Sequence, residues 1–189
     1  MPQNLSRRAF VFGAPLMLAG CAAEPVWAPQ SAIDARRFIG SGPPSLTVFT
    51  VKNTGSDNGA HTALLIDASE RVLFDPAGSF RTSVAPERND VLFGFGPAVE
   101  QAYVSFHART EYYVISQKIP VAAGTAAQAL QLAKANGAVP KANCTRATSG
   151  ILRQLPGFDD IGTTWFPNNL SDIIARRTDV TTREFREQD

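Results

Sequence analysis

Polar and apolar residues alternate along residues 45–51 (SLTVFTV), a run rich in β-branched side chains. A turn cluster, NTGSDNG, separates this run from a second β-forming run at residues 61–67 (HTALLID). The pattern predicts two antiparallel strands. A short turn near Ser69 then leads to residues 72–75 (VLFD), which we expect to fold back on the second strand as a hairpin. Residues 90–93 and 111–116 are predicted to add two further strands.

Later segments follow the helical period instead. Residues 97–107 begin with a proline, which suits the first turn of a helix, and carry apolar side chains at helical spacing. The spacing of Thr125 and Gln128 is typical of a capping box and predicts a helix that ends near Asn136. Two more helices are predicted, at residues 143–155 and just after Pro167. Together these elements indicate an α+β domain with an antiparallel sheet.

The first 20 residues have the layout of an export signal. A polar start with Arg7 and Arg8 and no acid leads into the apolar run VFGAPLMLAG, which ends at Cys21. This run is too short to cross a bilayer, which takes roughly 20 residues, so we expect a cleaved signal and not a transmembrane helix. The sequence LAGC at 18–21 resembles a lipobox, in which Cys21 receives the lipid, and SRRAF at 6–10 resembles the twin-arginine export signature.

These resemblances imply a lipoprotein of a bacterial cell envelope. The lipid on Cys21 would hold the protein in a membrane, facing the periplasm. Alanine, and not aspartate, follows Cys21 at position 22. By the sorting rule of such lipoproteins, this favours the outer membrane over the inner membrane.

Composition divides the chain into four parts. We expect a signal peptide (1–20), a lipidated and flexible tether rich in Ala, Pro and Ser (21–44), one domain (45–178) and a polar tail (179–189). Removal of the signal takes away two of the 18 basic residues and none of the 17 acidic ones, which leaves a net charge near −1. Nucleic acid is therefore not an expected partner, because phosphate binding needs a clustered excess of Lys and Arg.

Lipidation of Cys21 would leave Cys144 as a lone thiol. Such a thiol is a liability in an oxidising compartment unless it is buried or functional. Cys144 opens a predicted helix and has Lys141 and Arg146 nearby; the helix N-terminus and the cations both favour the reactive thiolate. This pattern indicates a nucleophile, while simple burial of a small side chain is the competing explanation.

Two histidines could act as the base for this nucleophile. His61 lies at the start of a predicted strand, which can hold an imidazole rigidly against a helix N-terminus. His107 lies near the end of a predicted amphipathic helix, where a solvated or helix-capping role is the simpler interpretation. We therefore predict that His61 is the base.

A third polar group usually orients the imidazole through its other nitrogen. Asp75 is the first candidate, because the predicted hairpin brings it within a residue or two of facing His61. An aspartate before Pro76 also suits a β-turn, so both interpretations stay open. Asn58 and Ser79 are weaker alternatives.

The order of these residues resembles a known family. A strand histidine in GAHTALLID, then a hairpin, and much later an Asn-Cys pair at a helix start in ANCTRATSGIL are similar to the circularly permuted papain-like hydrolases, relatives of the NlpC-type cell-wall peptidases and of lecithin retinol acyltransferase. The resemblance covers residues 46–174 and includes the late segment TTWFPNNLSDII. Many members carry a second histidine on the next strand, where this chain offers Asp75.

The resemblance implies a cysteine hydrolase of papain-like α+β fold. Cys144 would attack a carbonyl carbon, His61 would transfer the proton, and Asp75 would hold His61 in the useful tautomer. The backbone N–H of Cys144 would help to stabilise the oxyanion. Related folds cleave peptidoglycan stem peptides or act on lipid acyl chains, so peptidoglycan and acyl lipids are both candidate substrates.

Two other functions compete with this hypothesis. A metal site is poorly supported, because one thiol and two histidines without HxxxH or CxxC spacing fall short of a zinc set, and no cofactor is expected. A non-catalytic envelope lipoprotein that uses a papain-like domain for binding or scaffolding is the stronger competitor. It predicts a buried, unreactive Cys144 that His61 does not approach.

Overall fold

The computed structural model describes residue 23 and residues 25–187, and its centre is one antiparallel sheet. The strand order is β4-β5-β3-β2-β1-β6-β7. The strands are β1 (Ser45–Asn53), β2 (Gly59–Asp67), β3 (Arg71–Phe74), β4 (Glu87–Arg88), β5 (Val91–Leu92), β6 (Tyr112–Pro120) and β7 (Thr181–Phe185). The α+β class and the antiparallel sheet are thus confirmed.

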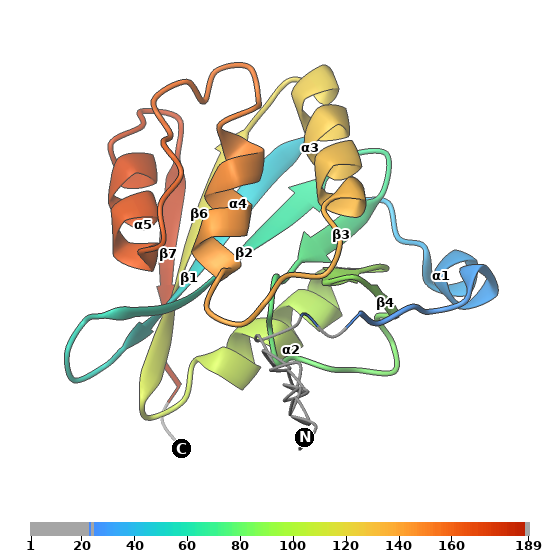
Figure 1. Ribbon diagram of the computed structural model, residues 1–189, viewed down its shortest axis with the longest axis horizontal. Helices are drawn as coiled ribbons and strands as arrows, with labels where there is room; N and C mark the ends of the chain where they lie inside the picture. Colours follow the sequence, from blue (N-terminus) through green and yellow to red (C-terminus); the bar gives the residue numbers. More distant parts are fainter. Residues whose placement is uncertain (1–22, 24, 188–189) are drawn as a thin grey trace, which may run out of the picture.

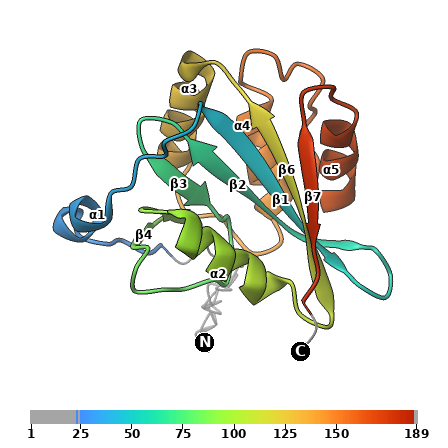
Figure 2. The ribbon, with the colours of Figure 1, turned by 180° about the vertical axis from the view of Figure 1, so that it is seen from behind.

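Helices cover both faces of the sheet. The helices are α1 (Gln30–Arg36), α2 (Pro97–His107), α3 (Ala123–Ala135), α4 (Cys144–Leu152) and α5 (Pro167–Ala175). Figure 1 shows α3, α4 and α5 side by side on one face, and Figure 2 shows α2 across the opposite face. The sheet therefore forms the middle layer of three.

Alternation along the strands divides the core in two. Leu46 and Val48 of β1 pack toward α3, α4 and α5, whereas Phe49 and Val51 pack toward α2. All four side chains are buried, because successive residues of a strand point to opposite faces of a sheet that is covered on both sides. The two core layers, one on each face of the sheet, therefore border the site from opposite sides.

Most predicted elements lie where the pattern placed them, and the helix at residues 97–107 has the predicted bounds. The capping box predicted at Thr125 and Gln128 is wrong. Helix α3 begins at Ala123 with Ala122 as its N-cap, so that Thr125 lies inside the first turn with its side chain buried. Packing of Thr125 against the domain has replaced the expected hydrogen bond to the backbone.

The flexible tether predicted at residues 21–44 is also wrong for its described part. Val26 and Ala28 form backbone hydrogen bonds with Asn89 and Glu87, and Ile33 of α1 is buried in the main core. The segment is ordered because it extends the edge of the sheet and buries an apolar side chain. The domain therefore begins well before residue 45.

The predicted boundary at residue 178 likewise falls short of the end of the domain. The polar tail (179–189) contains β7, which pairs with β6 from Val114↔Phe185 to Lys118↔Thr181. Its side chains are mostly exposed, as expected for a polar segment, but its backbone pairs with the edge of the sheet. Backbone pairing requires no apolar pattern, which explains why the sequence did not reveal it.

The predicted signal peptide and the lipobox with Cys21 lie outside the described residues. Within residues 25–187, no helix is long and apolar enough to cross a bilayer.

The two isoleucines of the N-terminal segment offer a test of its packing. Ile33 is 5% exposed and Ile39 is 59% exposed. We expect Ile33→Ala to lower the free energy of unfolding by about 2–3 kcal/mol and Ile39→Ala to change it by less than about 0.5 kcal/mol. Urea denaturation measures both, and equal effects would contradict the packing of α1 on the domain.

Candidate functional site

The structure brings His61 and Asp75 together as an ion pair. Nε2 of His61 lies 2.7 Å from Oδ1 of Asp75, whose side chain is fully buried. The β2–β3 register, Leu64↔Phe74 to Asp67↔Arg71, explains this contact, because Asp75 follows β3 directly and lies two positions from the point opposite His61. The hairpin predicted from the sequence therefore creates the contact.

Cys144 is the first residue of α4, and α4 is fastened to β2 beside His61. The hydroxyls of Thr62 and Thr145 are 3.0 Å apart and fully buried. The pairing of β3 with β2 stops at Leu64, and beyond this point the start of α4 lies along β2. The backbone N–H of Thr62 donates to the sulfur of Cys144. The threonine pair, the Thr62 N–H and the packing of α4 along β2 together position the helix start against the histidine strand.

The three groups form a chain of charges. His61 hydrogen-bonds both Asp75 and Cys144, and since Nε2 faces Asp75, Nδ1 is the nitrogen available to the sulfur. Burial opposes the imidazolium, but Asp75 and then Cys144 outweigh burial and raise the pKa of His61 to about 10. Burial also opposes the thiolate, yet His61, Thr62 and Thr145 lower the pKa of Cys144 to about 7. A thiolate–imidazolium pair is therefore accessible near neutral pH.

The cations that were expected to activate the thiol of Cys144 lie in solvent. Lys141 and Arg146 are both exposed, and the guanidinium of Arg146 lies over the ring of Trp165 at 5.2 Å. Charges in solvent are screened, so the buried imidazole of His61 exerts the larger effect on the pKa of Cys144. The activation of Cys144 that was predicted to come from these cations is therefore supplied by His61.

The first turn of α4 presents backbone N–H groups beside the sulfur. Asn143 precedes the helix, but its side-chain amide donates to the carbonyl of Lys141 at 3.0 Å and makes no cap hydrogen bond to α4. The first N–H groups of a helix lack intrahelical acceptors and carry the positive end of the helix dipole. They can therefore donate to a negatively charged oxygen that forms next to Cys144.

Two residues of α2 complete the site. The sequence did not single out Tyr103, and it favoured a solvated or helix-capping role for His107. The hydroxyl of Tyr103 donates to Oδ1 of Asp75 at 3.1 Å, and the ring of His107 lies parallel to that of His61 with centroids 5.9 Å apart. Burial, the largest influence, lowers the pKa of His107, and its Nδ1 bonds the carbonyl of Tyr103. The half-buried side chain of His107 thus forms one wall of the site. The spacing of four residues between Tyr103 and His107, which places them on one helix face, was the available signal.

The turn after Asp75 is shaped around the carboxylate. Ala77 has a positive φ of 55°, and the N–H of Gly78 donates to the carbonyl of Asp75. A Cβ added at Gly78 would lie 1.9 Å from Oδ2 of Asp75, so no larger residue fits at this position. Of the weaker alternatives for the third group, Asn58 is exposed in the β1–β2 turn, and Ser79 is exposed at the rim of the site.

A cavity of about 320 Å³ opens on the outer side of His61. Its walls come from β1, β2, α2, the start of β6 and the turn after Asp75, and they include Val51, Ala60, Gly78, Phe106, His107 and Tyr112. Most of these side chains are apolar or aromatic. The cavity can therefore hold an apolar group of a substrate next to the imidazole.

Two exposed aromatic residues lie near the start of α4. Trp165 is 52% exposed and Phe166 is 65% exposed. Hydrogen bonds between Thr164 and Ser149 fasten their loop to α4. Exposed aromatic side chains near a site commonly contact ligands, so this loop is a second candidate substrate surface.

The described residues contain no group of three or more His, Cys, Asp or Glu side chains placed to hold a metal ion. No protein-family model matches the chain, and no significant match was found among curated proteins or solved structures. The assignment of a function therefore depends on the geometry of the site.

We expect Asp75→Asn to weaken the charge on His61 and so raise the apparent pKa of Cys144. The carboxylate stabilises the imidazolium, and the imidazolium stabilises the thiolate, so that loss of the first charge moves the pKa of the thiol upward. The ultraviolet absorbance of the thiolate against pH measures this pKa. Asn58→Ala is the control that should leave it unchanged, and an unchanged value in Asp75→Asn would contradict the chain of charges.

A paired glycine substitution tests the turn. Gly78→Ala should lower the free energy of unfolding by about 1–3 kcal/mol, because the new methyl group collides with the Asp75 carboxylate. Gly124→Ala in α3 meets no atom within 4 Å and should leave stability unchanged or raise it by about 0.5 kcal/mol. Thermal denaturation compares the two variants. Equal stability would show that Asp75 is not held against this turn.

Proposed function

We propose that this protein is an exported, lipid-anchored cysteine hydrolase that cleaves an amide or ester bond through a thioester intermediate. The observation that supports the proposal best is the buried chain of charges from Asp75 through His61 to Cys144 at the start of α4. A nucleophile, a base and an orienting carboxylate in contact fulfil the requirement for covalent acyl transfer. The lipid would be carried by Cys21, in a bacterial cell envelope.

In the proposed reaction the thiolate of Cys144 attacks the carbonyl carbon of the substrate. The carbonyl oxygen becomes an oxyanion, to which the N–H of Cys144 and the dipole of α4 offer stabilisation. The imidazolium of His61 then protonates the leaving amine or alcohol as the carbon–heteroatom bond breaks, which leaves a thioester on Cys144. Neutral His61 next takes a proton from water, water attacks the thioester, and Cys144 and the free acid are released.

We also propose that the fold is a circularly permuted papain-like domain. The support is the chain order, with the histidine strand β2 and its hairpin to β3 first and the cysteine helix α4 much later. Helix α4 packs directly on β2, as the proposed fold requires. Peptides of the cell wall and acyl lipids are the candidate substrates, and the apolar cavity beside His61 suits a group of either.

Burial of the thiol favours one alternative function. Cys144 is 9% exposed, which suits a non-catalytic envelope module that binds or scaffolds. Such a module has no need for a base on the sulfur, whereas His61 hydrogen-bonds Cys144. This contact is why we prefer the hydrolase.

The rate of alkylation of Cys144 by iodoacetamide against pH tests the proposal. We expect the rate to rise with an apparent pKa of about 7 in the wild type, and this value to move toward about 8.5, that of a free cysteine, in His61→Ala. Loss of the imidazolium removes the largest influence that lowers the pKa of the thiol.

The rate of hydrolysis of acyl esters or cell-wall peptides should follow a bell-shaped pH profile with limbs near pH 7 and 10. The thiolate forms at the first limb, and the imidazolium loses its proton at the second.

His107→Ala is a comparison for this experiment, since His107 packs on His61 without being the proposed base. It should retain most of the shift in the pKa of the thiol. Slow labelling of Cys144 that His61→Ala leaves unchanged would refute the hydrolase and leave the binding module.

A further inference from the structure

The N-terminal segment is joined to the sheet edge from Val26 onward. The N–H of Asn89 donates to the carbonyl of Val26, and the N–H of Ala28 donates to the carbonyl of Glu87, each at 2.9 Å. Between them, Trp27 forms a β-bridge with Arg88 of β4. Residues 26–28 thus act as one more short strand. The backbone hydrogen bonds fix the position of this strand relative to the domain.

A lipid on Cys21 would bring this edge close to a bilayer. Val26 follows Cys21 by five residues, and a fully extended chain spans at most about 3.6 Å per residue, so the two are separated by no more than about 18 Å. The lipid enters the bilayer directly at Cys21. The edge formed by residues 26–28 and β4 therefore begins within about 18 Å of the anchor.

The side chains at this edge suit a membrane interface. Trp27 is 68% exposed, and the guanidinium of Arg88 lies 4.6 Å from the centre of its ring. Arg36, Arg37 and the 59% exposed Ile39 follow on the same segment. The acids between Cys21 and residue 42 are Glu24 and Asp34, so that Arg36, Arg37 and Arg88 leave an excess of one positive charge. Tryptophan and arginine are typical of the headgroup region, and excess positive charge favours anionic lipids.

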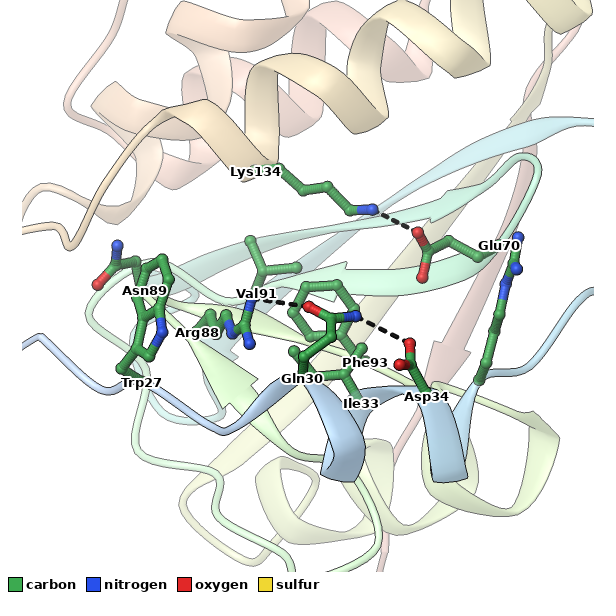
Figure 3. A pocket seen from close by; sticks show the side chains of 11 residues that line it. Trp27, Gln30, Ile33, Asp34, Glu70, Arg88, Asn89, Val91, Phe93 and Lys134 are labelled. Carbon is green, nitrogen blue, oxygen red and sulfur yellow. Dashed lines mark hydrogen bonds and ion pairs between the residues drawn. The ribbon is translucent and has the colours of Figure 1, made fainter.

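A cavity of about 340 Å³ lies beneath this segment. Figure 3 shows Trp27, Arg88 and Asn89 at one side of it, with Ile33, Val91 and Phe93 forming an apolar floor. Arg37 and an ion pair between Lys134 and Glu70 complete its rim. Among the charged side chains that line the cavity, Arg37, Arg88 and Lys134 outnumber Asp34 and Glu70. A net positive charge above an apolar floor is complementary to an anionic phospholipid, which offers an acyl chain and a phosphate together.

We propose that the surface formed by residues 26–39 and Arg88 docks on an anionic phospholipid bilayer. The proposal rests on the lipid anchor of the proposed function and adds an orientation to it. This surface adjoins the site, because Asp90, the neighbour of Asn89, accepts a hydrogen bond at its backbone carbonyl from the N–H of Asp75 at 2.8 Å.

The two tryptophans of the chain permit a direct test. The full-length chain is expressed, processed and reconstituted in vesicles of phosphatidylethanolamine and phosphatidylglycerol with brominated acyl chains. Trp165→Phe leaves Trp27 as the single tryptophan, and Trp27→Phe leaves Trp165 as the matched control. We expect Trp27 to emit at shorter wavelength and to be quenched at least about threefold more than Trp165, because only Trp27 enters the headgroup region.

Charge variants test the role of anionic lipid. Arg36→Glu combined with Arg37→Glu should reduce the quenching of Trp27, whereas Arg183→Glu on β7, at the opposite edge of the sheet, should not. Replacement of phosphatidylglycerol by phosphatidylcholine should have the same effect as the double variant.

The outcomes separate docking from the other proposals. Mass spectrometry of the N-terminal peptide shows whether Cys21 carries a lipid, and an unmodified Cys21 would overturn both the anchor and the docking. With the lipid present, equal quenching of Trp27 and Trp165 would overturn the docking alone. Strong quenching of Trp27 together with an unreactive Cys144 would support the docking and refute the hydrolase.

Discussion

The site depends on the ion pair between His61 and Asp75, because it places a stable positive charge in a buried position. A buried imidazolium costs a large desolvation energy unless a partner compensates for it. Asp75 is such a partner, and Tyr103 donates a second hydrogen bond to the same carboxylate oxygen. The charge on His61 in turn makes the thiolate of Cys144 accessible near neutral pH. The charge on each group therefore stabilises the ionised form of the next.

This chain of charges can form because the sheet is incomplete at one point. Strand β3 is short, so α4 meets β2 beyond Leu64, and its first residue lies beside the histidine strand. The Asp75 side chain enters the same junction from the end of β3, and α2 closes it from the other face of the sheet (Figure 2). The site thus lies where three layers meet, and small shifts of any layer would separate the groups.

The same short strands connect the site to the N-terminal segment. Asn89 and Asp90 lie in one turn, and they bond Val26 on one side and Asp75 on the other. An anchored segment that is packed on the domain restricts how the domain can rotate above a membrane, whereas a flexible tether would not.

Alternation and helical spacing are properties of neighbouring residues, so the sequence by itself determined most strands and helices, including the helix at residues 97–107. Residue chemistry also singled out Cys144, His61 and Asp75 as the groups to examine. The roles of Tyr103 and His107 and the packing of residues 25–42 were decided only by the tertiary structure. Hydrogen bonds act over about 3 Å, and contacts such as that between Thr62 and Thr145, 83 positions apart, exist only once the layers have packed.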